Sequence, residues 1–163
     1  MKYSKTIEGK VSARIARKQS PILLREDFDD LGGYDQVGRA LLALTKKGKL
    51  IKIGYGLYAK AKVSSLTGNT VPIEPLPALA QRALDRLGAA PGPSRAANDY
   101  QEERSTQVPT GRLISVNKRI SRKISYNNIA VSYERQSRRT EPKPQGRTTE
   151  FILTANKTIR ERK

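Results

Sequence analysis

The first 71 residues carry a pattern of hydrophobic and polar positions that predicts three helices followed by a hairpin of two strands. Apolar side chains first recur every three or four residues, as on the buried face of a helix, and later alternate with polar ones, as in a strand. Glycines stand where a helix or a turn must end. The predicted helices cover residues 6–18, 25–31 and 34–47, and the predicted strands cover residues 49–53 and 57–59.

The third predicted helix divides most clearly into a buried and an exposed face. Val37, Leu41 and Leu44 form its apolar stripe, because they recur at i, i+4 and i+7. A rotation of about 100° per residue then places a polar face on the opposite side of the helix. The residues on or beside that face are Asp35, Gln36, Arg39, Ala43 and Lys46.

The order of helices and hairpin is typical of a winged helix-turn-helix, in which the exposed face of the second motif helix enters the major groove of DNA. Arg39 is suited to the O6 and N7 atoms of guanine, and Gln36 is suited to adenine. The other interpretation is an ordinary helix face in contact with solvent. The sequence alone leaves both interpretations open.

The predicted hairpin adds donors suited to phosphate oxygens. Its turn, Gly54-Tyr55-Gly56, allows the positive φ angles that a tight hairpin requires. Basic side chains surround the hairpin, although lysines also protect the edge strand of an ordinary surface hairpin. The residues predicted to complete the DNA-binding surface are Lys47, Lys49, Lys52, Tyr55 and Lys60.

Residues 72–163 predict a second, smaller α/β domain, so the fold class of the whole chain is α+β. Closely spaced prolines mark the boundary after residue 71. Period-two alternation from Arg112 onward predicts an antiparallel sheet, and a terminal helix is expected to close the domain. The predicted elements are helices at 78–87, 94–100 and 148–162 and strands at 112–117, 119–126 and 129–136. Ser94 is expected to cap the second of these helices, and Asn127-Asn128 is expected to form the turn between the last two strands.

The charge of the chain makes a polyanion the expected partner. The 163 residues carry 32 Lys and Arg against 15 Asp and Glu, a net charge of +17. Residues 1–71 hold a net +8 and residues 112–163 a net +10, whereas the stretch between them is close to neutral. Nucleic acid is the commonest polyanionic partner. No apolar run reaches the roughly 18–20 residues of a membrane span, so a cytoplasmic protein without a membrane partner is expected.

The absence of cysteine and histidine argues against an enzyme. It excludes disulfides and thiolate metal sites, and it removes the commonest general base. A cluster of aspartates at residues 27–35 could hold magnesium, but acids also gather at helix starts because of the helix dipole. We expect no catalytic residue, no metal site and no cofactor.

A second function class remains open, that of a nonspecific RNA- or ribosome-associated binding protein. The basic stretches in residues 119–126 and 137–147 favour it. Aromatic side chains for stacking on bases are few in the second half, where Tyr126 and Tyr133 are the candidates. Packing in the core or at a strand edge is the better explanation for both tyrosines. Competition between duplex DNA and RNA discriminates between the two classes.

Residues 24–62 resemble the N-terminal winged helix of AbiEi-type antitoxins and of the related AbiEi transcriptional regulators. The family has an F-x-D-L-G motif, a V-x-x-A-L-x-x-L helix and an R-G-L-Y-like wing. The corresponding segments here are residues 28–32, residues 37–44 and Tyr55-Gly56-Leu57-Tyr58. The similarity extends over about residues 7–135, and Tyr55 stands where the family usually has an arginine.

The resemblance implies an antitoxin of a type IV toxin–antitoxin pair. In that class the winged helix binds operator DNA and represses its own operon, and the C-terminal part counters a nucleotidyltransferase toxin. The expected partners are therefore a double-stranded operator and a nucleotidyltransferase toxin. The operator sequence and the oligomeric state are not given by the residues.

Overall fold

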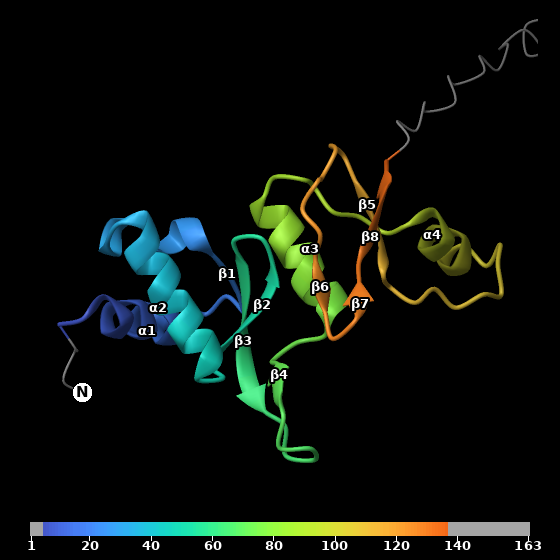
Figure 1. Ribbon diagram of the computed structural model, residues 1–163. Helices are drawn as coiled ribbons and strands as arrows, with labels where there is room; N and C mark the ends of the chain where they lie inside the picture. The colour runs from blue at the N-terminus through green and yellow to red at the C-terminus, as the bar shows by residue number, and fades with distance from the viewer. Residues whose placement is uncertain (1–4, 137–163) are drawn as a thin grey trace, which may run out of the picture.

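The computed structural model describes residues 5–136, which form a mixed α+β fold (Figure 1). The elements of the first half are α1 (Ile7–Arg17), β1 (Ile22–Leu24), the 3₁₀ helix η1 (Arg25–Leu31), α2 (Tyr34–Lys46), β2 (Leu50–Gly54), β3 (Leu57–Val63) and β4 (Thr70–Pro72). Those of the second half are α3 (Leu76–Arg86), α4 (Arg95–Gln101), β5 (Leu113–Val116), β6 (Ser125–Tyr126), β7 (Ile129–Ala130) and β8 (Ser132–Arg135). The predicted α+β class is confirmed.

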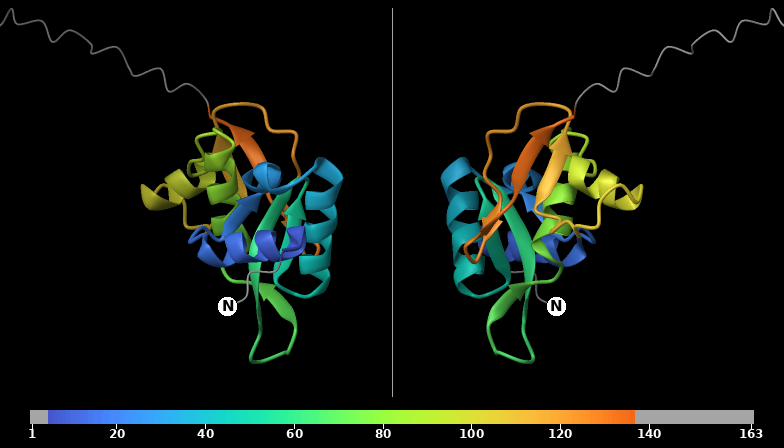
Figure 2. Two further views of the ribbon diagram at one scale, coloured as in Figure 1. Left: turned by 90° about the vertical axis from the view of Figure 1, so that its left-hand side faces the viewer. Right: turned by 90° about the vertical axis from the view of Figure 1, so that its right-hand side faces the viewer.

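The central sheet is antiparallel, with β3 between β1 and β2. The far end of β3 also pairs with β4, so this hairpin projects beyond the rest of the fold (Figure 2). The sequence predicts a return strand that ends at Ala59 and a loop from Val63 onward. The predicted strand is too short, because β3 runs to Val63, where it pairs with Thr70, whereas residues 64–69 form a loop as predicted.

The two faces of the central sheet belong to two hydrophobic clusters. Leu23 and Leu50 face the cluster formed with α1, η1 and α2. Their neighbours Ile22 and Ile51 face the opposite cluster, which is completed by α3 and the second half of the chain. Successive residues of a strand point to opposite faces. The sheet is therefore covered by helices on both sides (Figure 1).

The helical layer of the first half follows the predicted stripes. Val11 and Ile15 of α1 are buried against Val37, Leu41 and Leu44 of α2, as their spacing predicts. The side chain of Thr6 accepts a hydrogen bond from the N–H of Gly9 and caps α1.

Gly32 differs from the prediction of a left-handed cap after η1. Its backbone is extended, with φ of 166° and ψ of 175°. A Cβ atom at this position would lie 2.9 Å from Cδ1 of Ile7. A side chain at Gly32 would therefore require the end of the Ile7 side chain to shift, whereas the extended backbone itself does not call for glycine.

The second half contains strands that pair in an unexpected way. β5 and β8 are parallel, with Ile114 opposite Tyr133, whereas β6 and β7 form an antiparallel hairpin. The prediction of an antiparallel sheet is therefore wrong for the first pair and right for the second. The turn of the hairpin, Asn127-Asn128, has the two positive φ angles of a tight turn, as its sequence predicts.

The predicted strand at 119–126 is also wrong, since only Ser125 and Tyr126 pair as a strand. Ile124 is fully buried and Ile120 packs against the same cluster, while the charged residues between them face outward. The predicted α4 and its Ser94 cap are confirmed, because the Ser94 side chain accepts from the N–H of Ala97. The predicted helix at 148–162 lies outside the described residues.

The predicted domain boundary at residue 71 falls within β4. One hydrophobic cluster crosses it, because Ile22, Ile53 and Leu57 pack with Leu79 and Leu84 of α3. The division into domains 1–71 and 72–163 stays a prediction, and the two parts share a core.

Beside this shared core, a single carboxylate of η1 is bonded to three other elements, namely α3, β1 and the end of α1. Asp27 accepts hydrogen bonds from Arg86 Nη1 at 2.8 Å and Nη2 at 2.6 Å, and Lys18 forms an ion pair with it. Its oxygen also accepts the N–H of Leu24 at 2.8 Å. Burial acts to raise the pKa of this carboxyl, but the hydrogen bonds from Arg86, Lys18 and the backbone hold the pKa well below its usual range.

We expect Asp27→Asn to lower the free energy of unfolding at pH 7 by about 2–3 kcal/mol, because Arg86 and Lys18 lose their counter-charge. A carboxyl whose pKa is lowered in the folded state stabilises above its unfolded pKa of about 4, and the effect is lost as the pH falls below that value. Urea denaturation at several pH values measures both effects. The difference between wild type and variant should shrink below about pH 4.

Asp30→Asn is the matched control, since Asp30 forms an ion pair with Arg14 but is exposed. It should have a smaller effect at pH 7. Equal losses in the two variants, or an Asp27→Asn difference that does not change with pH, would contradict a role for Asp27 in joining the elements.

Candidate nucleic-acid interface

The outer face of α2 is exposed along its length, opposite the buried stripe. Asp35, Gln36, Arg39 and Lys46 are exposed, as the helical rotation predicts. Leu42 is also exposed on this face, with 56% of its surface accessible, and the sequence analysis did not single it out. This face contains both polar groups and an apolar side chain beside the β2–β3 hairpin.

Seven of the ten residues predicted to bind DNA fall into two groups around α2. Asp35 and Arg39 line a depression together with Arg25, Tyr34 and Leu42. Lys52 and Tyr55 line a second depression that also includes Arg25 and Tyr34. The two depressions therefore adjoin, and these four predicted residues share one surface at the hairpin end of α2.

The second group of predicted lysines lies close to α1. Lys47 forms an ion pair with Glu8, and Lys49 Nζ lies 3.4 Å from Oγ of Ser12. Lys60 donates a hydrogen bond to the backbone oxygen of Lys18 at the end of α1. The sequence does not indicate these partners, because they come from segments distant along the chain.

Gln36 and Ala43 also have structural roles. The Gln36 side-chain oxygen accepts the N–H of Gly33 at 3.2 Å and caps the start of α2. Ala43 is partly buried in a shallow depression that Ile7, Gln36 and Arg39 also line. The amide oxygen of Gln36 is thus occupied by the backbone, whereas no hydrogen bond or ion pair of Arg39 is found within residues 5–136.

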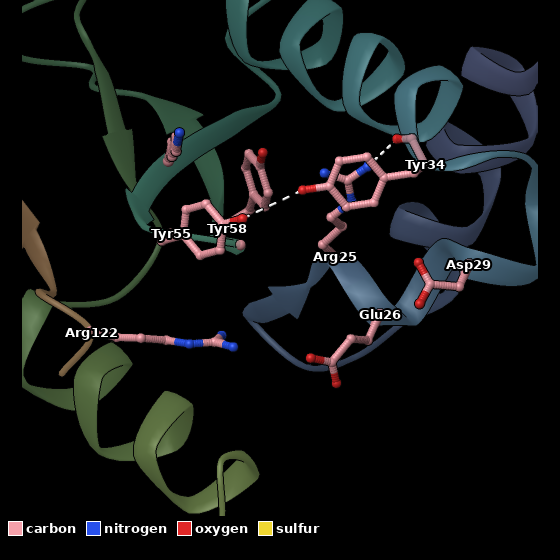
Figure 3. Close-up of a pocket in the computed structure, with 9 residues that line it drawn as sticks. Arg25, Glu26, Asp29, Tyr34, Tyr55, Tyr58 and Arg122 are labelled. Atoms are coloured by element: carbon pink, nitrogen blue, oxygen red, sulfur yellow. Dashed lines mark hydrogen bonds between the residues drawn. The ribbon is translucent and has the colours of Figure 1, made fainter. Parts of the chain in front are cut away.

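We name the depression at the hairpin end the tyrosine cleft (Figure 3). It has a volume of about 240 Å³ and lies between η1, the start of α2 and the β2–β3 hairpin. Glu26 and Asp29 line it from η1. The other side chains that line it are Arg25, Tyr34, Lys52, Tyr55, Tyr58 and Arg122.

Arg25 lies at the centre of this site, and the sequence analysis did not identify it. Its guanidinium lies 3.1 Å from the ring centroid of Tyr34, a cation–π contact, and donates to the Tyr34 backbone oxygen. The buried Nε atom has no hydrogen-bond partner among the described residues. No sequence signal links the two residues, because the chain turns through the Gly32-Gly33 segment between them.

The tyrosines of the cleft are held close together. The hydroxyl oxygens of Tyr34 and Tyr55 lie 3.4 Å apart (Figure 3). This hydrogen bond raises the pKa of Tyr34, although Arg25 acts against it. Burial raises the pKa of Tyr58, which lines the cleft from β3. Both rings are uncharged at neutral pH, because an ordinary tyrosine pKa is about 10 and the shifts are upward.

Arg122 reaches the cleft from the second half of the chain. It belongs to the irregular segment before β6, and the predicted strand at 119–126 gave no indication of this position. The segment fits against the hairpin because Gly54 has no side chain. A Cβ atom there would lie 2.8 Å from the backbone oxygen of Lys123.

The acidic residues around η1 do not gather into a cation site. Asp27 and Asp30 are each engaged by basic side chains. Across residues 5–136, no three His, Cys, Asp or Glu side chains are placed to hold a metal ion. In the same range, no helix has the length and apolar character needed to cross a membrane.

The fold and this surface define a mixed α+β protein with a cationic, tyrosine-lined site beside an exposed helix. The chain belongs to the family of unknown function DUF6088, whose family model matches residues 8–163. No curated protein and no solved structure matches the chain.

Two glycines near the cleft should respond in opposite ways to an added methyl group. Gly54→Ala should lower the free energy of unfolding by about 1–3 kcal/mol, because the new Cβ meets the Lys123 backbone. Gly38→Ala should raise it by about 0.5–1 kcal/mol, because Gly38 is inside α2 and a Cβ there has ordinary contacts with Arg25. Thermal and urea denaturation measure both changes. A neutral Gly54→Ala variant would contradict the close fit of the 119–124 segment.

Proposed function

We propose that this protein binds double-stranded DNA sequence-specifically, with α2 in the major groove and the β2–β3 hairpin as a wing. The observation behind the proposal is the exposed face of α2, where Arg39 has no partner among the described residues. Arg39 lines a depression with Arg25 and Tyr34, and these two residues also line the cleft at the hairpin. The order α1, β1, η1, α2, β2, β3 agrees with that of a winged helix-turn-helix.

The packing of the first half supports this proposal. The α2 helix is buried on one side against α1 and η1, so its outer face has a fixed direction. Lys52 and Tyr55 extend the same surface onto the hairpin. The net charge of +17 supplies long-range attraction to a polyanion.

Selection from a random pool of DNA duplexes tests the proposal. The full-length protein should enrich one sequence motif, and the same motif is expected in the promoter of its own gene if the protein is an autoregulator. Binding to the selected duplex should exceed binding to a scrambled duplex of equal length at the same salt concentration. Equal affinity for both duplexes, or stronger binding of duplex RNA, would overturn the proposal.

Arg39 and Lys52 should affect DNA binding in different ways. Arg39→Ala should weaken the binding of the selected duplex by about 1–3 kcal/mol, because a base contact carries the sequence preference. It should weaken the binding of the scrambled duplex much less. Lys52→Ala should weaken the binding of both duplexes to the same degree. It should also reduce the slope of log K against log salt concentration by about 1, because a phosphate contact releases counterions. Fluorescence anisotropy at several salt concentrations measures both effects.

Arg104→Ala is the matched control for these variants. Arg104 is exposed and forms ion pairs with Asp99 and Glu102 at the end of α4, on the opposite side of the molecule from α2 (Figure 1). Its removal lowers the net charge equally and should leave the discrimination between duplexes unchanged. If Arg39→Ala weakened every duplex to the same degree, α2 would not be the reading helix.

We also propose, from the resemblance to AbiEi-type antitoxins alone, that the protein counters a nucleotidyltransferase toxin. Co-expression tests this part separately from DNA binding. Growth inhibited by a nucleotidyltransferase encoded beside this gene should be restored by the wild-type protein. Continued inhibition at full expression of both proteins would remove the antitoxin proposal and leave the DNA-binding proposal in place.

A further inference from the structure

We propose that the tyrosine cleft binds a single nucleotide, with its base stacked on Tyr55 and Tyr34 and its phosphate against Arg122 and Lys52. This inference goes beyond the reading of duplex DNA by α2, because it concerns one nucleotide that is not stacked in a duplex. It adds Tyr34 and Arg122 as ligand-binding side chains, whereas Lys52 and Tyr55 also belong to the surface proposed for the duplex. The shared chemistry is that of a free mononucleotide or of one extruded nucleotide in a strand.

The tyrosine rings supply the surface for the base. Tyr55 is 71% exposed and Tyr34 is 65% exposed, although both are large aromatic side chains. Their hydroxyls lie 3.4 Å apart, so the two rings belong to one wall (Figure 3). Exposed aromatic rings in a cationic groove are the usual platform for an unpaired base. By contrast, Tyr126 and Tyr133 are partly buried and donate to backbone oxygens, so they belong to the core.

The cations of the cleft are available to a phosphate. Within residues 5–136, neither Lys52 nor Arg122 forms an ion pair. Arg25 is held in place by its cation–π contact with Tyr34, so its charge is already beside the cleft before a ligand binds. Charged hydrogen bonds to phosphate from a planar guanidinium are strong and directional.

The carboxylates on the η1 side distinguish a nucleotide from a simple anion. Glu26 and Asp29 line the cleft and form no ion pair among the described residues. They would repel inorganic phosphate at their end of the cleft, but they can accept hydrogen bonds from base N–H groups. A ligand with a donor-bearing base at one end and a negative charge at the other fits this distribution.

The size of the cleft limits the ligand to about one nucleotide. Its volume of about 240 Å³ is below the ~300–1,000 Å³ of sites for drug-sized ligands. The lining residues come from η1, α2, the hairpin and the segment before β6. Four separate segments thus converge on one small cleft. An ordinary solvent-exposed surface does not require such convergence.

Calorimetric titration of the full-length protein tests the proposal. The ligands are the four ribonucleoside 5′-monophosphates, with ribose 5-phosphate and inorganic phosphate as controls. At least one mononucleotide should bind about tenfold or more tightly than ribose 5-phosphate, because only the nucleotide offers a base for stacking. Equal binding of all these ligands would overturn the nucleotide site, because it would show a nonspecific cationic surface. Binding of none of them would exclude a free mononucleotide as the ligand.

Variants of the cleft assign the binding to its side chains. Tyr55→Ala should lower the affinity for the mononucleotide at least about fivefold. Tyr55→Phe should retain this affinity, because stacking needs the ring and not the hydroxyl. Arg122→Ala should weaken the mononucleotide but not the corresponding nucleoside. Arg119→Ala is the control, since Arg119 is an exposed arginine of the same segment that does not line the cleft. Circular dichroism verifies that each variant is folded.

Oligonucleotides distinguish the two sources of the nucleotide. A DNA duplex with one bulged nucleotide is compared with the fully paired duplex, for wild type and Tyr55→Ala. A preference for the bulged duplex that Tyr55→Ala abolishes assigns the cleft to a strand, whereas binding of mononucleotides alone assigns it to a free ligand. If neither depends on Tyr55, the proposal is overturned.

The two proposals fail independently. If the protein recognises its selected duplex but binds neither a mononucleotide nor a bulged duplex, only the nucleotide-site proposal is overturned. If the protein binds mononucleotides through Tyr55 but does not distinguish DNA sequences, only the proposed function is overturned.

Discussion

The Asp27 carboxylate is the constraint on which the arrangement of the two halves depends. Apolar contacts across the central sheet hold α3 in place, but such contacts are non-directional. The two hydrogen bonds from Arg86 to Asp27 fix the direction of α3 relative to η1. The same carboxylate accepts the N–H of Leu24 and pairs with Lys18, so β1 and the end of α1 meet at this point. The position of η1, and with it Arg25, follows.

The central sheet transmits this arrangement to the candidate interface. One of its faces packs on α1, η1 and α2, and the other packs on α3 and the strands of the second half. A hairpin covered on one side only would be free to twist. Here the segment before β6 lies against Gly54 and brings Arg122 beside the hairpin turn. The second half thus contributes to a surface that its own sequence does not suggest.

The sequence predicted the features that depend on local periodicity. The buried stripe of α2, the Ser94 cap and the Asn127-Asn128 turn are all found, because each is fixed by residues within a few positions of one another. The parallel pairing of β5 with β8 was missed, since strand alternation does not encode the direction of a partner. In residues 119–126, the spacing of Ile120 and Ile124 suited a strand, but their burial against the shared core decided the conformation.

The candidate site was predicted where local sequence pattern marks it, on α2 and on the β2–β3 hairpin that carries Lys52 and Tyr55. Arg39 and Asp35 lie on the exposed face of α2, which helical rotation alone identifies. Arg25 and Arg122 were missed because their positions depend on contacts between distant segments. The partners of Lys47 and Lys60 were missed for the same reason, since both contact α1.

Arg25 and Tyr34 connect the two parts of the interface. Both residues line the tyrosine cleft and also the depression beside Arg39. Gly38 lies next to the Arg25 guanidinium, and a Cβ at this position would be in ordinary van der Waals contact with that group. A nucleotide stacked in the cleft and a duplex placed on α2 would therefore both contact the same arginine–tyrosine pair. Because the cation–π contact fixes one geometry for that pair, the two ligands would meet a single preorganised surface rather than two independent ones.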